Sequence, residues 1–396
     1  MATVRKITVE ELEVGMRVVD TGLSWIDHPY LFSREGLIVS QAQIEAIKDE
    51  GYLELFVEQA GENFTLPGPG PAQPARTPAA NLAPYRQELG KAKTIYADSL
   101  GFARDFIREA KLGKPVNYQA SAPLVEEVIA SVTRNPDALV SLIKLRAYDE
   151  YTYTHCINVS VLAVVFGRYL GLDEIRLRQL GSAGLFHDLG KTGVPDEILN
   201  KPGRLTEHEF QAIKAHPALG AELLSSQPGV PQEVLRAIRE HHEKFNGQGY
   251  PQGLKDQTQS SGAQILSLAD VYDALTSKRV YKDAVIPVGA MRIMFGMRGR
   301  DFSPDMVDSF IKCLGIFPVG SLVRLKNGAV AVVCRSNPRE PLLPTVRIVL
   351  DQNLRRCQPT ILDLASPEAK AMDGSQDIAD NLDHTALGLD PTAFLT

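Results

Sequence analysis

Histidines and an aspartate suited to metal binding are concentrated in one part of this chain. His187 and Asp188 are adjacent, and His216 and the pair His241-His242 follow them. The chain has eight histidines, and most of them fall in this region. Neutral imidazoles mixed with carboxylates suit Fe, Mn, Zn and similar divalent ions. The pattern therefore predicts a metal site, because unpaired ionisable groups rarely accumulate in a protein core.

The segment around His187 and Asp188 is apolar, so a carboxylate there must be paired or bound to metal. Two adjacent residues on one helix point about 100° apart. They can border one cavity only near a helix end, or in a site that holds two metals. A carboxylate can bridge two ions while imidazoles complete each one, and His241-His242 presents the same geometry.

Further candidates lie on apolar segments that should be helical. His155 stands at the start of one such segment and is expected to point inward. Asp270 and Asp273 are i, i+3 neighbours on another, so one can bind metal while the other orients a ligand. Glu240 and Glu243 flank the histidine pair, and we interpret them as solvated or as supporting the ligands from behind.

Cationic side chains follow the candidate ligands. Lys191 lies four residues after His187, and Arg279 and Lys282 follow Asp270. Lysine and arginine near helix ends are commonly only solvated, but phosphate oxygens need such donors. Two metal ions with these cations would let a bridging hydroxide attack phosphorus while the charges stabilise the transition state.

These residues fall in five motifs that together span residues 151 to 282. The motifs are Tyr151-Thr-Tyr-Thr-His155, His187-Asp-Leu-Gly-Lys191, His216-Pro-Ala-Leu-Gly220, His241-His-Glu-Lys-Phe-Asn-Gly-Gln-Gly249-Tyr-Pro251 and Leu268-Ala-Asp270-Val-Tyr-Asp-Ala-Leu-Thr-Ser-Lys-Arg279-Val-Tyr-Lys282. Their combination resembles the HD-GYP subgroup of the HD-domain metal phosphohydrolases, which are bacterial cyclic di-GMP phosphodiesterases. Residues 5–57 resemble the small module that often precedes this domain.

The resemblance implies a role for each matching residue. Metal ligation is implied for His187, Asp188, His216, His241, His242 and Asp270. Catalysis would centre on Asp188 and Lys191, and phosphate contacts are implied for Lys191, Arg279 and Lys282. Gly249, Tyr250 and Pro251 would form the loop that names the family, here called the GYP loop. It would shape the nucleotide pocket, with Tyr250 touching substrate, or would dock diguanylate cyclase domains.

One position departs from the members of the family that hold three metals. Those members carry a glutamate four residues before the early histidine, whereas this chain has Tyr151 there. The nearby Glu150 is turned away from the face of His155, since five helical residues turn about 500°. We therefore expect two divalent ions, with iron or manganese favoured and nickel or zinc compatible. His155 is then a ligand, a supporting group or a phosphate contact, and Asp273 a ligand or a supporting group.

The resemblance implies hydrolysis of cyclic di-GMP to linear pGpG, with GMP as a further product, in bacterial signalling. Two alternatives stay open. One is an HD phosphohydrolase that acts on another nucleotide, and the other is a cyclic di-GMP receptor or docking protein with little turnover. A homodimer is compatible with the sequence.

Composition limits the class of protein. The chain has 396 residues, of which 44% are hydrophobic and 23% charged, as in an ordinary globular protein. A formal net charge of -6 argues against general nucleic-acid binding. The four cysteines are scattered, and neither a signal peptide nor a transmembrane segment is evident. We expect a cytoplasmic protein without nucleic-acid or membrane partners.

The fold class expected is mainly α, with a small α+β module before the helical domain and a short β appendage after it. The expected units are 1–62 (an N-terminal α+β regulatory module), 63–84 (a Pro/Ala-rich linker), 85–315 (the helical catalytic domain), 316–365 (a β extension) and 366–396 (an acidic, disordered tail). The linker should let the two sides move as separate bodies. Sensing, dimerisation or occlusion of the active site are all compatible with the module, and we hypothesise that it regulates catalysis.

Hydrophobic periodicity supports this division. In the module, residues 41–50 are predicted to form a helix capped by Ser40. In the helical domain, the predicted helices include 124–134, 158–170, 231–242 and 265–275. After residue 320, two alternating runs around Asn327-Gly328 predict a hairpin, and residues 345–350 a third strand.

Overall fold

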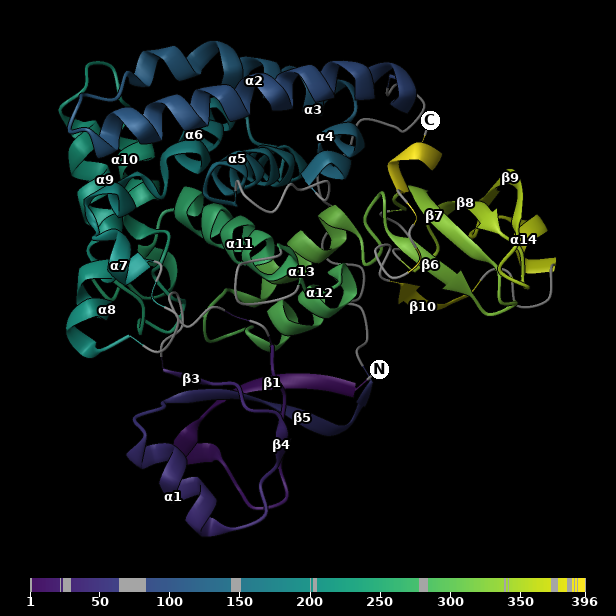
Figure 1. Ribbon diagram of the computed structural model, residues 1–396, viewed down its shortest axis with the longest axis horizontal. Helices are drawn as coiled ribbons and strands as arrows, with labels where there is room; N and C mark the ends of the chain where they lie inside the picture. The colour runs from purple at the N-terminus through teal and green to yellow at the C-terminus, as the bar shows by residue number, and fades with distance from the viewer. Residues whose placement is uncertain are drawn as a thin grey trace.

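The computed structural model describes most of the chain. It covers residues 2–371 apart from 22, 24–29, 64–82, 144–150, 200, 202–204, 278–283, 338–339 and 341, and also residues 377–382, 387, 389 and 391–395. The fold is mainly α, which confirms the expected class, and Figure 1 shows a large helical domain with a smaller mixed unit at each end of the chain. None of the described helices is long and apolar enough to cross a membrane.

The helical domain is built around α5, whose residues 159–166 are all buried. Its helices are α2 (Tyr85–Lys111), α3 (Ala122–Arg134), α4 (Pro136–Ile143), α5 (Tyr151–Tyr169), α6 (Glu174–Phe186), α7 (Asp196–Leu199), α8 (Glu207–Lys214), α9 (His216–Ser225), α10 (Gln232–Glu240), α11 (Ser261–Thr276), α12 (Pro287–Gly296) and α13 (Pro304–Leu314). The four helices predicted from periodicity are all present, with most ends shifted by a few residues and the start of α5 seven residues earlier than predicted. Gly184 brings α6 against α5, since an added Cβ would lie 2.5 Å from Ser160 Cα.

The described residues of the N-terminal module, 2–63 apart from 22 and 24–29, form a five-stranded sheet and one α-helix. Its elements are β1 (Ala2–Thr8), β2 (Arg17–Val18), β3 (Leu31–Phe32), β4 (Gly36–Leu37), α1 (Gln41–Asp49) and β5 (Glu54–Asn63). The strand order is β1-β5-β2-β4, and β3 pairs in parallel with β5. The Ser40 hydroxyl accepts a hydrogen bond from Gln43 N, as predicted for the helix cap.

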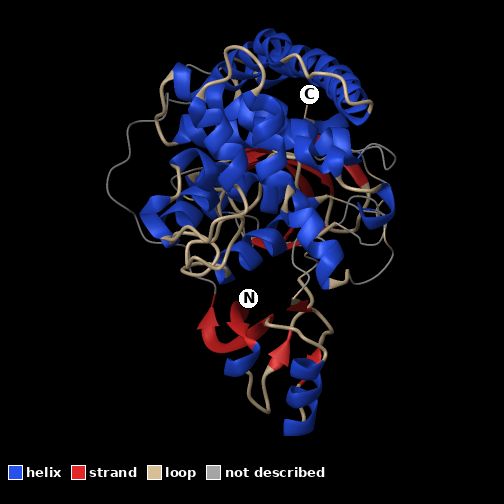
Figure 2. Ribbon diagram, turned by 90° about the vertical axis from the view of Figure 1, so that its left-hand side faces the viewer, coloured by secondary structure: helices blue, strands red, loops and turns tan. Residues whose placement is uncertain are grey.

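The module contacts the helical domain directly, which differs from the expectation of two bodies that move separately. Figures 1 and 2 show its strands facing the helices and α1 on the far side. Val4 and Phe56 belong to the same apolar core cluster as the helical domain. An added Cβ at Gly296 of α12 would lie 2.5 Å from Val4 O, so β1 lies on the backbone of that helix. The predicted linker lies almost entirely outside the described residues.

The C-terminal unit is an antiparallel sheet of order β10-β6-β7-β8-β9. Its strands are β6 (Leu322–Leu325), β7 (Val330–Arg335), β8 (Thr345–Leu350), β9 (Arg356–Asp363) and β10 (Ile378–Leu382). The predicted hairpin is present between β6 and β7, and Gly328 in its turn has a φ of 92° that favours glycine.

The described residues at the end of the chain are ordered, unlike the expected disordered tail, whereas residues 372–376, 383–386, 388, 390 and 396 lie outside the described part. After a short helix, α14 (Pro367–Ala371), β10 pairs with β6 at the edge of the sheet. Leu389 and Leu395 are buried against Val330 and its neighbours. A few well-placed leucines therefore give this acidic segment an apolar surface to bury, although its average composition is polar.

Candidate metal centre

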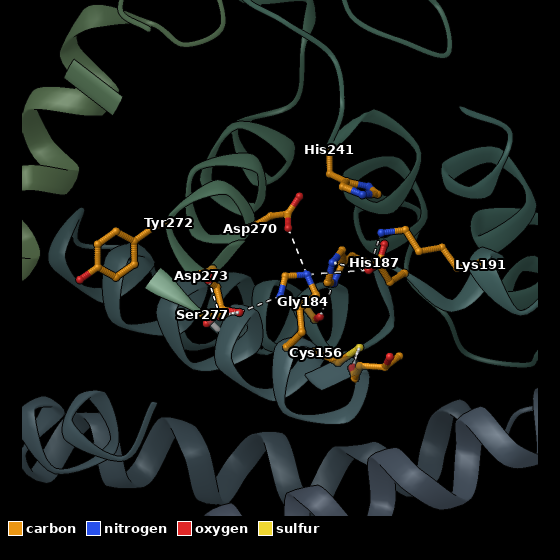
Figure 3. Close-up of polar contacts among 12 residues, drawn as sticks. Cys156, Gly184, His187, Lys191, His241, Asp270, Tyr272, Asp273 and Ser277 are labelled. Atoms are coloured by element: carbon orange, nitrogen blue, oxygen red, sulfur yellow. Dashed lines mark hydrogen bonds and ion pairs between the residues drawn. The ribbon is translucent and has the colours of Figure 1, made fainter. Parts of the chain in front are cut away.

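The candidate ligands come mainly from helix ends, as adjacent ligand residues require. His187 follows the last residue of α6, and Asp188 precedes a 3-10 helix (Leu189–Gly193). His216 is the first residue of α9, and His241 follows α10 directly. Because the regular helix stops at each place, neighbouring side chains can turn toward one cavity. Figure 3 shows His187 and Lys191, which lie close together after α6, converging with His241 and with Asp270 of α11.

Two further residues reach the same place from within helices. His155 lies one turn into α5, and Asp270 lies in the middle of α11. The two helices pack together, and His155 Nε2 stands 3.1 Å from Asp270 Oδ1 and 3.7 Å from Asp188 Oδ2. The structure thus brings together residues that the sequence separates by more than one hundred positions.

Backbone carbonyls fix the orientation of three imidazoles. The Nδ1 atoms of His187, His216 and His241 lie 2.8, 2.8 and 2.6 Å from the carbonyl oxygens of Gly184, Ile213 and Ile238. A carbonyl can only accept, so each Nδ1 donates its hydrogen and each neutral ring keeps its lone pair on Nε2. The Nε2 atoms face other candidate ligands, since His216 Nε2 lies 3.3 Å from His241 Nε2 and His187 Nε2 lies 3.4 Å from Asp188 Oδ2. This is the arrangement of metal-binding histidines.

Burial keeps His216, His241 and His242 neutral. Removal from water lowers the pKa of His216 to about 3 and the pKa of His241 to about 4. It also lowers the pKa of His242 well below the ordinary value of 6.5. Neutral imidazoles at physiological pH are ready to bind a cation.

Among the described residues, seven form three overlapping groups, and within each group the ligand atoms lie within 4.8 Å of one another. The groups are His216, His241 and His242; His155, His187 and Asp188; and His187, His241 and Asp270. His187 Nε2, Asp188 Oδ1 and His242 Nε2 are buried without a hydrogen-bond partner among the described residues. Buried polar atoms without a partner are costly, and divalent ions would satisfy them. The donor set therefore fits divalent metal.

Asp188 and Asp270 are ionised within this cluster. Burial alone would raise the pKa of Asp188, but the Lys191 ammonium and the nearby histidines hold it well below its usual value. Lys191 Nζ lies 2.9 Å from Asp188 Oδ2 and is partly exposed. Burial would also raise the pKa of Asp270, but the hydrogen bond from His155 and the charges of the surrounding histidines together hold it well below its usual value.

Asp273 is placed to orient His155, a role that helix spacing left open between the two aspartates of α11. Its Oδ2 lies 2.8 Å from His155 Nδ1 and accepts a hydrogen bond from Ser277 Oγ at 3.0 Å. Asp273 is absent from all three candidate metal groups, whereas Asp270 belongs to one. Burial would lower the pKa of His155, but hydrogen bonds to both aspartates raise it to about 9. A metal ion at His155 would have to displace that proton.

The GYP loop folds back onto the histidine pair. Tyr250 stacks on the His242 ring with centroids 4.8 Å apart, and Tyr250 N donates to His242 O at 3.2 Å. Glycine is needed at position 249, because an added Cβ would stand 2.2 Å from Lys244 N. The loop is therefore packed against the segment that carries the candidate ligands.

Glu240 and Glu243 are both buried, so the solvated alternative is wrong for them. The Glu243 carboxylate accepts hydrogen bonds from Gln252 N at 2.6 Å and Leu254 N at 2.9 Å. Glu240 accepts from Ser260 N at 2.7 Å, at the start of α11. Each glutamate holds a neighbouring segment in place. Their position beside the histidine pair was the only sequence signal for this role.

A cavity opens beside the cluster. Its lining includes His242, Tyr250 and Asp270 from the helical domain and Leu23 from the N-terminal module. Lys214 is a cation that sequence reasoning missed, with Nζ 5.7 Å from the centre of the Tyr250 ring. Its only sequence signal is its place two residues before His216.

The predicted phosphate contacts, the surface position of His208 and the number of metals remain to be compared with the structure. Arg279 and Lys282, the predicted phosphate contacts, lie outside the described residues. His208, which matches no motif, is exposed on α8 as expected. The side chain of Tyr151 is not described, so the expectation of two rather than three metals stays a prediction.

Family profiles match three parts of the chain. An HD domain matches residues 124–306, a domain of unknown function (DUF3391) matches residues 4–121, and a KOW domain associated with HD domain matches residues 322–369. The second match extends through the predicted linker and includes α2. All of the candidate ligands fall inside the first match.

Curated relatives cover different shares of the chain. Cyclic di-GMP phosphodiesterase PA4108 from Pseudomonas aeruginosa is 36% identical over 87% of this chain and 84% of its own length. The cyclic di-GMP phosphodiesterase response regulator RpfG from Xanthomonas campestris is 36% identical over 49% of this chain and 53% of its own length. The 3'3'-cGAMP-specific phosphodiesterase 3 from Vibrio cholerae is 33% identical over 43% of this chain and 37% of its own length.

Proposed function

This chain belongs to the HD-domain family of cyclic di-GMP phosphodiesterases, and from that premise we propose that it hydrolyses cyclic di-GMP at a centre of two divalent ions. The first product would be linear pGpG, and a second hydrolysis would release GMP. The observation that carries the proposal is the convergence of buried Nε2 and carboxylate atoms beside a cavity that also contains the GYP loop tyrosine.

The grouping of the ligands supports two ions. The group of His216, His241 and His242 shares no member with the group of His155, His187 and Asp188. The third group has His187 in common with the second group and His241 in common with the first. Each Nε2 atom has one lone pair and can bind only one ion. These residues can therefore give three ligands to each of two ions, but they cannot give three ligands to a third ion as well. Asp188 is suited to bridge, because its Oδ1 lies 3.3 Å from His216 Nε2 and its Oδ2 3.4 Å from His187 Nε2.

Bound ions would supply a hydroxide near neutral pH and would neutralise charge on the phosphate. The remaining functions, namely further positive charge, orientation of the ligands and contact with the nucleotide, would fall to the protein's own residues. Lys191, held beside Asp188, places a positive charge at the edge of the cluster where a phosphate oxygen can reach it. The buried backbone carbonyls already hold the imidazoles in place, so the imidazoles need not rearrange when metal binds. Tyr250 would border the nucleotide, and Arg279 and Lys282 remain predicted phosphate contacts.

The test is turnover of cyclic di-GMP by full-length protein purified without oxygen and loaded with ferrous or manganous ion. Products are separated by chromatography and bound metal is counted. We expect pGpG or GMP, about two ions per chain, and loss of turnover in Asp188→Ala and His216→Ala. The matched control is His208→Ala, an exposed histidine, which should keep both activity and metal.

Two results would contradict the proposal. No product with both ions bound would favour a cyclic di-GMP receptor, and Asp188→Ala would then keep any protein partner. Faster turnover of 3'3'-cGAMP than of cyclic di-GMP would indicate a different nucleotide. Docking of diguanylate cyclase domains on the GYP loop, and a homodimer, stay predictions.

A further inference from the structure

Four charged side chains, two of them buried and two half-buried, join the N-terminal module to the helical domain. Lys6 and Glu54 come from the module, and Lys244 and Asp301 from the helical domain. Lys6 Nζ lies 2.8 Å from Asp301 and 3.0 Å from Glu54, and Lys244 Nζ lies 3.2 Å from Asp301 and 3.3 Å from Glu54. Each cation therefore contacts one carboxylate on each side of the interface. We call this set the charge cluster.

The charge cluster contacts the segment that bears the candidate ligands. Lys244 lies two residues after His242, and Gly249 of the GYP loop lies against its backbone. Phe245 N donates to Asp301 O at 3.0 Å, which fastens the same segment to Asp301. A displacement of Glu54 would therefore displace Lys244 and the GYP loop that lies against it.

A second contact approaches the GYP loop from its other side. Tyr30 of the module lies edge-on to Phe210, with ring centroids 5.4 Å apart, and its hydroxyl donates to Glu207. Phe210 in turn lies edge-on to Tyr250 at 6.4 Å. The ammonium of Lys214 stands 4.5 Å from the Phe210 ring and within 6.0 Å of both tyrosine rings.

The two contacts are linked inside the module. Glu54 N donates to Tyr30 O at 3.1 Å, so the residues that touch Lys244 and Phe210 are adjacent. Leu23 of the same module lines the cavity beside His242 and Asp270. The module therefore supplies one wall of the cavity and braces the loop that forms another.

We propose that Tyr30 and Glu54 are positioning residues for the substrate pocket, and that the module is a fixed wall of that pocket. Glu54 acts through Lys244, and Tyr30 acts through Phe210 and Tyr250. Any ligand or partner that displaces the module would weaken substrate binding before it alters the chemical step. The part that concerns substrate rests on the proposed function; the part that concerns the loop does not.

Hydrogen exchange of the full-length protein tests the bracing directly. We expect the amides of Tyr250, Gln252 and Leu254 to exchange about tenfold faster or more in Glu54→Gln and Tyr30→Ala. Glu45→Gln is the matched control, because Glu45 is an exposed glutamate of the module on α1. Tyr30→Phe keeps the ring contact and should exchange like wild type. Unchanged exchange at these amides in both test variants would overturn the proposal.

Kinetics with metal-loaded protein then separate positioning from a general loss of structure. In Glu54→Gln and Tyr30→Ala we expect KM to rise several-fold, with kcat and metal content close to wild type. Unchanged exchange in the α5 and α6 amides would show that the core is intact. A higher kcat/KM in either variant would overturn the proposal in favour of occlusion by the module. If no protein turns over cyclic di-GMP, the proposed function fails while the exchange result still decides the bracing.

Discussion

Gly190 lies against His216 so closely that a Cβ added at Gly190 would stand 2.0 Å from the His216 carbonyl oxygen. This contact sets the distance between the Asp188 turn and the start of α9, which carry ligands of two different groups. Gly190→Ala should therefore push the two segments apart and reduce bound metal and turnover by at least about tenfold.

Gly193→Ala is the control for that change. It lies three residues further on, and its added Cβ would meet only Leu219 Cδ1 at 3.9 Å. Metal counting and cyclic di-GMP turnover should be close to wild type in this variant. If Gly190→Ala also binds two ions and turns over normally, the packing of these segments does not set the metal site.

Asp273→Asn should weaken metal binding without removing a predicted ligand. The amide cannot hold the His155 proton as the carboxylate does, so the imidazole loses its orientation. Loss of such a supporting carboxylate typically costs about 10- to 100-fold in metal affinity. Metal titration of Asp273→Asn beside Asp98→Asn, an exposed aspartate of α2, measures the effect. Equal affinities would show that His155 needs no orientation by Asp273.

The metal-free protein should be most stable near pH 6.5. His216 and His241 have folded pKa values of about 3 and 4, so the unfolded chain takes up protons first as the pH falls from 6.5. Stability should decline through that window. His155 has a folded pKa of about 9, so its contribution is complete below 6.5 and is lost as the pH rises through 9.

Urea unfolding of chelator-treated protein between pH 4 and pH 10 checks this profile. His216→Gln should flatten the acid side and His155→Gln the alkaline side, while His208→Gln should change neither. A profile of His216→Gln that keeps the wild-type slope below pH 6.5 would refute the assignment of that slope to buried imidazole.

Much of the candidate site could be predicted from the sequence. Adjacent ligands such as His187-Asp188 limit the geometry strongly, because both can border one cavity only near a helix end or in a site that holds two metals. Helix spacing alone could not choose between Asp270 and Asp273, since both lie on the inner side of α11, and only the family resemblance favoured Asp270 as the ligand. That choice depends on where His155 Nδ1 points, which is set by the packing of α5 against α11.

The same local reasoning could not predict how the N-terminal module sits. Lys6 and Asp301 are 295 positions apart, and each alone resembles an ordinary surface charge. The proline-rich linker favours separate bodies, whereas the contact is fixed by charges that meet only in the folded chain. Average composition likewise could not predict that part of the C-terminal tail is ordered. Its average composition is polar, but Leu389 and Leu395 are placed so that the C-terminal sheet can bury them.

Glu243→Gln should release the end of the GYP loop. The buried carboxylate accepts two backbone N–H groups, and a side-chain amide offers only one acceptor oxygen. Loss of a charged hydrogen bond of this kind costs about 1.5–3 kcal/mol. We expect faster amide exchange at Gln252 and Leu254 and lower kcat/KM. Wild-type values for both would show that the loop is held by other contacts.

The charge cluster also has an evolutionary consequence. Lys6, Glu54, Lys244 and Asp301 balance one another, with side chains that are 0%, 14%, 21% and 3% exposed. Loss of any one of them would strand an opposite charge away from water, which proteins tolerate poorly. These four positions, spread over both ends of the chain, are therefore expected to be inherited as a set. Homologues that lack the module should be free of the constraint at the two positions that remain.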